Sequence, residues 1–130
     1  PPVLEKFGLK DALNELVLDF NSTDNIHIQL SFEIIFSKEV TNVHLQIFRI
    51  IQELINNSIK HGKATLITIS FSKNSCAYSD NGIGFDNSKL EKTMGLGFSN
   101  IKNRIRNING TFKLTSAIND GFKFNFSFQE

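Results

Sequence analysis

The segment from about residue 42 to residue 61 constrains the fold most, because apolar residues surround nearly the whole circumference of a predicted helix. At about 100° per residue, the polar side chains of this segment fall within one narrow stripe (Gln46, Arg49, Glu53, Asn57 and Lys60). Apolar side chains occupy most of the remaining surface (Val43, Ile47, Ile50, Ile51, Leu54 and Ile55). Such a helix is largely buried with one polar face, and Gly62 ends it.

The other periodicities predict an α+β fold. Helices are predicted at 8–20 and 97–109, and strands are predicted at 26–36, 64–72, 75–79, 111–117 and 121–128. Residues 21–25 form a turn cluster, and a turn at residues 119–121 joins the last two strands into a hairpin. The order α-β-α-β-β-α-β-β predicts a two-layer α/β sandwich, in which three main helices cover one face of a mixed sheet of about five strands.

The composition indicates one globular domain, and we take residues 1–130 as that domain, since 40% of the residues are hydrophobic and 21% are charged. The net charge is only +1, so we expect neither nucleic acid nor an anionic membrane as a partner. Cys76 is the single cysteine, which excludes an internal disulfide and favours a reducing compartment. The sequence contains no apolar run near the roughly 18 residues that a membrane-spanning helix needs.

Three residues of the polar stripe have the chemical types that phosphoryl transfer uses. Glu53 can accept a proton or orient an attacking group, Asn57 can offer its carbonyl oxygen to Mg²⁺, and Lys60 can neutralise phosphate charge. Their spacing stacks them on one helix face. A solvated helix face is the alternative explanation, and His61 either reaches a phosphate or interacts with the helix C-terminus. Asn56 lies about 100° round the helix, so we expect it outside the site.

Two glycine-rich turns follow this helix in the sequence. Residues 80–84 (DNGIG) follow a short predicted strand, and residues 95–97 (GLG) precede a predicted helix. Asp80 can accept a hydrogen bond from an exocyclic amine such as that of adenine, and glycines would keep the floor beneath a base free of side chains. Backbone amides at a helix N-terminus bind phosphate readily. Each turn also has an ordinary explanation, as a hairpin turn or as a helix start.

In this order and spacing, the three segments resemble the catalytic and ATP-binding domain of bacterial sensor histidine kinases, which shares the Bergerat fold with gyrase, Hsp90 and MutL. QELINNSIKHG (52–62) resembles the N box of that family, DNGIGFD (80–86) its G1 box and MGLGFSNIKNR (94–104) its G2 box. The short ATP lid at about 86–94 is similar to that of the nitrate/nitrite-sensor subgroup. GLKDALNELV (8–17) resembles the helix that opens the domain, so the resemblance covers nearly the whole chain.

The resemblance implies a role for each matching residue. Glu53 would be the acid/base residue and Asn57 the ligand of Mg²⁺, while Lys60 and His61 would lie beside the phosphates of ATP. Asp80 would take the adenine amine. The two glycine turns would supply the remaining ATP-binding residues, with Gly82 and Gly84 beneath the ring and Gly95 and Gly97 as hinges of the lid (Gly82, Ile83, Gly84, Gly95, Leu96 and Gly97).

Two features depart from the pattern of the family. The family has Gly-Thr where this chain has Gly121-Phe122, and a phenyl ring cannot donate the hydrogen bond by which the Thr hydroxyl helps to fix adenine. Phe98 stands where the subgroup commonly has Leu.

The phosphorylated histidine of such kinases lies on a separate upstream helical hairpin, and none of the three histidines of this chain fits that place (His27, His44 and His61).

We therefore expect a cytoplasmic Mg-ATP-binding domain that is a fragment of a longer kinase, with or without a membrane anchor. It would transfer the γ-phosphate to a histidine on the dimerisation helices of its parent chain, and a response regulator would receive the phosphoryl group next. We expect the isolated domain to be monomeric. The alternatives are a serine kinase of the anti-sigma type and a non-catalytic nucleotide-sensing module. Gyrase-like or Hsp90-like hydrolysis fits less well, because those proteins carry longer lids and further domains.

Overall fold

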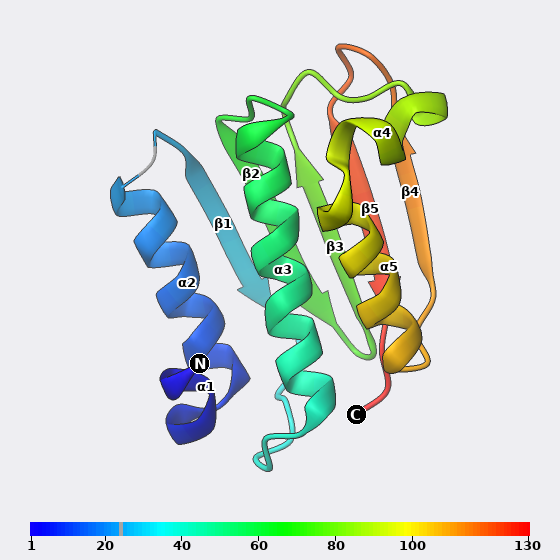
Figure 1. Cartoon of the computed structure of the whole chain (residues 1–130). Helices are drawn as coiled ribbons and strands as arrows, with labels where there is room; N and C mark the ends of the chain where they lie inside the picture. The colour runs from blue at the N-terminus through cyan, green and yellow to red at the C-terminus, as the bar shows by residue number, and fades with distance from the viewer. Residues whose placement is uncertain (24) are drawn as a thin grey trace.

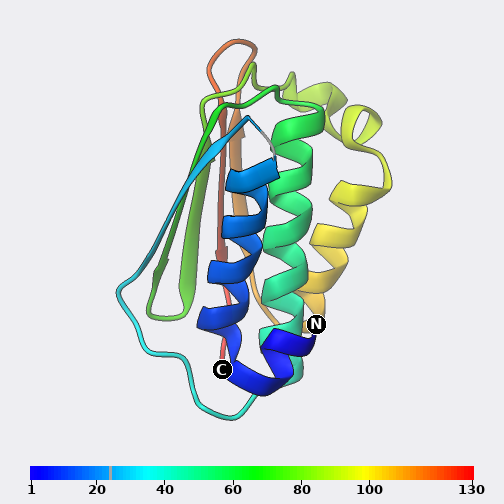
Figure 2. The same ribbon diagram turned by 90° about the vertical axis from the view of Figure 1, so that its left-hand side faces the viewer.

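The computed structural model describes residues 1–23 and 25–130 and has two layers (Figure 1). One layer is a five-stranded sheet, and the other is a row of helices that covers one face of it (Figure 2). This arrangement confirms the predicted α/β sandwich. No helix in the described part of the chain is long and apolar enough to cross a membrane.

The sheet has the strand order β1-β2-β3-β5-β4. β1 (His27–Phe32) lies at one edge and pairs in parallel with β2 (Leu66–Ser72). β3 (Ser75–Asp80), β5 (Phe122–Ser127) and β4 (Phe112–Ser116) then follow in antiparallel pairs. The sheet is therefore mixed, as predicted, and β4 and β5 form the predicted hairpin.

Three long helices form the second layer, with α3 (Asn42–Lys60) between α2 (Leu9–Thr23) and α5 (Leu96–Asn107) (Figures 1 and 2). The apolar side chains of α3 are almost completely buried (Ile47, Ile50, Ile51, Leu54 and Ile55). They lie on the sheet face formed by the inward side chains of the strands (Ile67, Ile69, Phe71, Cys76, Tyr78, Phe122, Phe124 and Phe126). The predicted buried helix is confirmed, and the core surrounds it.

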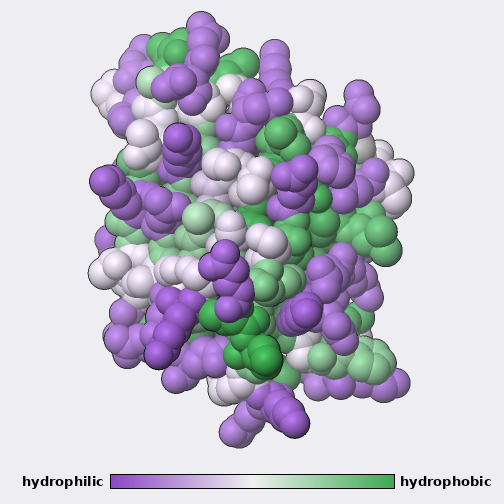
Figure 3. Space-filling view, turned by 180° about the vertical axis from the view of Figure 1, so that it is seen from behind, coloured by the Kyte–Doolittle hydropathy of each residue, from purple (hydrophilic) through white to green (hydrophobic). Residues whose placement is uncertain are grey.

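The alternation of Phe along β5 follows from this packing, because successive strand residues point to opposite faces. Phe122, Phe124 and Phe126 are buried beneath the helices, while Lys123 and Asn125 point to the bare face. The surface seen from behind is a mixture of hydrophilic and intermediate residues with scattered apolar ones (Figure 3). Helices therefore cover only the face of the sheet that the apolar residues occupy.

The first predicted strand was too long and the first predicted helix was too short. β1 ends at Phe32, although the apolar alternation of the sequence continues to Ile34. Its one partner strand, β2, ends at Ser72, so residues after Phe32 have no strand with which to form further backbone hydrogen bonds. α2 extends through Asn21, Ser22 and Thr23, so the turn predicted at 21–25 is wrong for these three residues. The hydroxyls of Ser22 and Thr23 donate to the carbonyl of Asp19. Position 24 lies outside the described residues.

Three short helices were not predicted. These are α1 (Pro2–Phe7), the 3₁₀ helix η1 (Asn87–Lys89) and α4 (Leu90–Met94). α4 is only five residues long and buries two apolar side chains one turn apart, Leu90 and Met94. Such short segments give too few repeats for a helical period to be recognised. The lid segment, residues 86–94, therefore consists mainly of η1 and α4.

Candidate functional site

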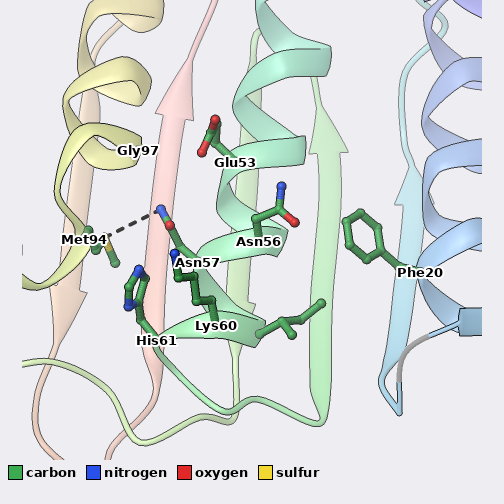
Figure 4. A pocket seen from close by; sticks show the side chains of 9 residues that line it. Phe20, Glu53, Asn56, Asn57, Lys60, His61, Met94 and Gly97 are labelled. Atoms are coloured by element: carbon green, nitrogen blue, oxygen red, sulfur yellow. Dashed lines mark hydrogen bonds between the residues drawn. The ribbon is translucent and has the colours of Figure 1, made fainter.

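The polar stripe of α3 forms one wall of a cavity of about 430 Å³ (Figure 4). Glu53, Asn57 and Lys60 line this cavity together, as their spacing predicted. His61 follows them at the end of α3, and Gly97 faces them from the first turn of α5. The remaining lining residues are Phe20, Asn56, Ile59 and Met94. The cavity thus lies at the C-terminal end of α3, between this helix and its neighbours.

The first turn of α5 approaches the polar stripe closely enough that a side chain at position 97 would crowd it. A Cβ atom added at Gly97 would lie 3.1 Å from Oε2 of Glu53 and 3.2 Å from Oδ1 of Asn57. Glycine therefore lets the main chain of α5 reach the two oxygen-bearing side chains. The same turn begins at Gly95, which precedes the helix with a φ of 60°, and its free amides belong to a helix N-terminus, where anions bind.

Lys60 and His61 give the far end of the cavity its basic character. Lys60 is exposed, and the main-chain amide of His61 donates to the carbonyl of Asn57, which closes the last turn of α3. Burial, and then the neighbouring charge of Lys60, lower the pKa of His61. Both effects disfavour the imidazolium form of His61. Lys60 is therefore the cation that this end of α3 provides at neutral pH.

The lid segment covers the inner part of the stripe. The amide nitrogen of Asn57 donates to the sulfur of Met94 at 3.8 Å (Figure 4). Glu91 of α4 forms an ion pair with Lys102 of α5, which ties the lid to that helix. Asn57 is consequently almost fully buried, and its polar atoms face Met94 and Gly97.

Asp80, at the end of β3, is joined to α3 by a network of hydroxyl groups. The hydroxyl of Ser58 donates to Oδ2 of Asp80 at 2.6 Å and lies 2.5 Å from the hydroxyl of Tyr78. The main-chain amide of Gly82 donates to Oδ1 of Asp80 at 2.9 Å. Burial raises the pKa of Asp80, while hydrogen bonds from Ser58 and the amides of Gly82 and Phe122 lower it. The carboxylate is thus held from two sides and only partly exposed.

The glycines of the turn after β3 have a structural reason to be glycine. A Cβ at Gly82 would collide with the carbonyl oxygen of Gly62, which accepts a hydrogen bond from the amide of Ile83 at 2.8 Å. A Cβ at Gly84 would collide with the carbonyl of Ala117, and Gly84 also has a φ of 68°. The backbone at the end of α3 and the backbone of the turn after β3 are therefore in direct contact.

The side chain of Phe122 belongs to the core. It is 2% exposed, and its ring contacts Tyr78 and Phe85 edge to face, with centroid distances of 6.3 and 5.7 Å. Phe98 is likewise buried and contacts Phe112 edge to face. Both unusual phenylalanines are thus part of the apolar layer between helices and sheet.

The structure brings some of the predicted site residues into one cavity and places others around it. Glu53, Asn57, Lys60, His61 and Gly97 line the cavity, whereas the other predicted residues are not among its lining (Asp80, Gly82, Ile83, Gly84, Gly95 and Leu96). The side chains of Ile83 and Leu96 are 46% and 81% exposed.

Asn56 corrects a sequence-based expectation, because this exposed residue does line the cavity. Ser58 and Met94 were not predicted at all. For Ser58 a signal existed, since it is a polar residue beside Leu54 and Ile55 on the apolar part of α3. The contact of Met94 with Asn57 depends on the fold of the lid and has no local signal.

The donor set of the cavity fits Mg²⁺ better than a metal that needs several protein ligands. The described residues contain no group of three or more His, Cys, Asp or Glu side chains that could hold a metal ion. The cavity offers instead the carboxylate of Glu53 and the amide oxygen of Asn57, both of which face Gly97. Mg²⁺ binds to such hard oxygens and usually takes its other ligands from phosphates and water.

Comparison with known protein families gives a match over residues 42–130, from the start of α3 to the end of the chain. The matching family is described as "Histidine kinase-, DNA gyrase B-, and HSP90-like ATPase". Every residue that lines the cavity except Phe20 lies within the matched range.

Among curated proteins, the chain is 34% identical over 128 residues to the sensor histidine kinase ComP of Bacillus subtilis. It is 32% identical over 125 residues to the sensor histidine kinase LiaS of the same species. These alignments cover 95% and 93% of this chain but only 17% and 34% of the relatives. The chain thus spans about a third or less of the length of these two relatives.

Solved structures share the fold. The blue-light activated histidine kinase EL346 of Erythrobacter litoralis superimposes with a TM-score of 0.75 at 15% identity, over 89% of this chain and 40% of that chain. The ATP-binding domain of PrrB from Mycobacterium tuberculosis superimposes with a TM-score of 0.67 at 20% identity, over 91% of this chain and 90% of that chain. The two-layer sandwich is therefore that of histidine kinase ATP-binding domains.

Proposed function

The chain belongs to the family of histidine kinase-, DNA gyrase B- and HSP90-like ATPases, and on this premise we propose that it is the catalytic domain of a sensor histidine kinase. In this proposal the domain binds Mg-ATP and transfers the γ-phosphoryl group to a histidine on the dimerisation helices of its parent chain. A response regulator then receives the group. The domain works in the cytoplasm, where ATP is available, whether or not the parent protein has a membrane anchor.

The observation that carries the proposal is the shared cavity of Glu53, Asn57 and Lys60. A carboxylate, an amide oxygen and an ammonium group project from successive turns of one helix into one space (Figure 4). Phosphoryl transfer depends mainly on positioning and on stabilising the charge of the transferred group. These three groups, together with the amides at the start of α5, supply both functions.

The triphosphate would lie along the cavity between α3 and α5. Lys60 neutralises phosphate charge at one end, and the amides of Leu96 and Gly97 donate from the N-terminus of α5 at the other. Asn57 would hold Mg²⁺ through its side-chain oxygen, with Glu53 beside it. When bound, Mg²⁺ supplies charge neutralisation for the phosphate oxygens. Met94 contacts the amide nitrogen of Asn57, so this contact does not use the side-chain oxygen that we assign to the metal.

Glu53 is the residue that we assign to the incoming histidine. Its carboxylate lies in the cavity beside the main chain of Gly97. It accepts a hydrogen bond or a proton from the imidazole of the acceptor and so directs the other ring nitrogen towards the γ-phosphorus. The P–N bond forms as the bond between the γ-phosphorus and the bridging oxygen breaks, and ADP leaves.

The adenine end of ATP is assigned to the turn after β3. Asp80 accepts the hydrogen bond of the exocyclic amine, because a carboxylate has about four acceptor positions and the donors Ser58, Gly82 and Phe122 use three of them. Gly82 and Gly84 would lie beneath the ring, as the resemblance implies, and Ile83 would cover the ring from its exposed position.

The test is transfer of labelled phosphate from γ-labelled ATP to the separately prepared dimerisation helices of the parent chain. We expect Mg²⁺-dependent labelling of a histidine, recognised because phosphohistidine is lost in acid. Glu53→Gln should retain ATP binding and lose transfer by about 10²-fold or more, while Glu39→Gln, on an exposed loop, should behave as the wild type. ATP binding without transfer to any acceptor would favour a nucleotide-sensing module, and acid-stable labelling of a serine would favour the serine-kinase alternative.

A further inference from the structure

Ser58 is a buried polar residue in the part of α3 that packs on the sheet. It is 2% exposed and lies one residue after Asn57. Its hydroxyl contacts two groups of β3, Oδ2 of Asp80 at 2.6 Å and the hydroxyl of Tyr78 at 2.5 Å. The hydroxyl of Tyr78 also lies 2.9 Å from the carbonyl oxygen of Leu54. Ser58 thus connects the carboxylate that we assign to adenine with the core.

The protons available in this network favour a chain directed towards Asp80. Tyr78 and Ser58 carry one hydroxyl proton each, so with an ionised carboxylate they can fill two of the three contacts. The hydroxyl of Tyr78 faces two acceptors, the Ser58 oxygen at 2.5 Å and the carbonyl of Leu54 at 2.9 Å, which has a second lone pair beside its helical hydrogen bond. The proton of Ser58 in turn donates to Asp80. A distance of 2.6 Å is typical of a hydroxyl that donates to a carboxylate.

β5 offers no hydroxyl at the corresponding place. Phe122 pairs with Asp80 through the main chain, and its ring is buried between Tyr78 and Phe85. The hydroxyl that the resemblance leads one to expect from β5 is therefore absent, while a different hydroxyl reaches the same carboxylate from α3.

We propose that Ser58 is the positioning residue for adenine recognition: its hydroxyl, oriented by Tyr78, holds the carboxylate of Asp80 for the purine 6-amine. This inference rests on the proposed function, because it assumes that Asp80 accepts the amine of bound ATP. It adds a residue on α3 to the base-binding end of the site, next to the residue assigned to the metal. Base recognition and metal binding then share one helical turn.

The test compares ATP with ITP, which carries an oxygen in place of the 6-amine but the same triphosphate. Binding of both nucleotides is measured by calorimetry for the wild type, Ser58→Ala and Tyr78→Phe. Ser72→Ala is the matched control, since the hydroxyl of Ser72 hydrogen-bonds to that of Ser75 at the opposite end of β3 from Asp80. We expect the wild type to prefer ATP. Ser58→Ala should lose about three- to tenfold of its ATP affinity, the worth of one hydrogen bond, with ITP affinity unchanged.

Tyr78→Phe should lower the ATP preference in the same direction by a smaller factor, and Ser72→Ala should leave it unchanged. An ATP preference that stays at the wild-type value in folded Ser58→Ala overturns the inference and leaves the proposed function intact. Equal losses for ATP and ITP also overturn it, because Ser58 would then be merely structural. If Ser58→Ala does not fold, the ratio of ATP affinity to ITP affinity in Tyr78→Phe tests the inference instead. Failure of the wild type to bind ATP overturns both the inference and the proposed function.

Discussion

Asp80, which we assign to the adenine end of the proposed site, lowers the stability of the fold when it is ionised. Burial raises its pKa above the ordinary value near 3.8, although hydrogen bonds from Ser58, Gly82 and Phe122 oppose this effect. A carboxyl group with a raised pKa in the folded state favours folding fully below its unfolded pKa. That contribution is lost as the pH rises through the folded pKa. At neutral pH the ionised carboxylate therefore destabilises the empty domain.

We predict that Asp80→Asn changes stability and ATP binding in opposite directions. The amide oxygen can still accept from the amide of Gly82, and the new NH₂ group can donate to Ser58. The thermal midpoint at pH 7 should therefore rise, and the gap to the wild type should narrow as the pH falls towards 4. ATP affinity should fall about tenfold or more, because the amine loses a charged acceptor. Thermal unfolding across this pH range and calorimetry check both parts.

Two outcomes would contradict this account of Asp80. Unchanged ATP affinity in Asp80→Asn would remove Asp80 from the adenine site. A lower thermal midpoint of Asp80→Asn at pH 7 would show that the ionised carboxylate stabilises the domain without ATP. That result would contradict the destabilisation that we derive from the burial of Asp80.

At the scale of elements, the packing of α5 on α3 explains a glycine inside a helix. Gly97 lies in the first turn of α5, and alanine forms helices more readily than glycine. The close approach of Glu53 and Asn57 accounts for it, since a methyl group would crowd both side chains. Glycine is needed at position 97 to leave room for side chains that line the cavity, and not to let two backbone segments pack together.

We predict that Gly97→Ala preserves or slightly raises stability and weakens ATP binding about tenfold. The gain in helix propensity is at most about 1 kcal/mol, while the methyl group occupies space that the triphosphate needs. Asn103→Ala, at an exposed position of the same helix, should change the thermal stability as Gly97→Ala does but should keep the ATP affinity of the wild type. Thermal unfolding and calorimetry separate the two effects. Full ATP affinity in Gly97→Ala would place the triphosphate elsewhere.

The elements also show which features a sequence can predict. α3 and its polar stripe follow from a local period that repeats over five turns, and the glycine turns follow from residue type. The end of β1 could not be predicted, because it depends on where β2 stops, 40 residues later. Ser58 and Met94 join the site only when β3 and the lid pack against α3. Local patterns thus predicted the residues of the stripe, and tertiary packing added their partners.

At the scale of the whole molecule, the fold places the candidate site where four segments meet at one end of the sandwich. The end of α3, the turn after β3, the lid segment and the start of α5 lie side by side there (Figures 1 and 4). The buried face of α3 packs this end on the sheet, while the lid contacts Asn57 through Met94 and contacts α5 through the ion pair of Glu91 with Lys102. In the proposed function, α3 positions the triphosphate and the lid segment lies beside it.

The account depends most on Asn57 as the group that couples the metal to ATP, and calorimetric titration of ATP with and without Mg²⁺ tests it most directly. The wild type should bind ATP more tightly when Mg²⁺ is present. Asn57→Ala should lose this tightening while its circular dichroism stays native, and Asn103→Ala, the same change at an exposed position of α5 outside the cavity lining, should retain it. Tightening by Mg²⁺ that survives in Asn57→Ala, or a wild type that does not bind ATP, would contradict the account.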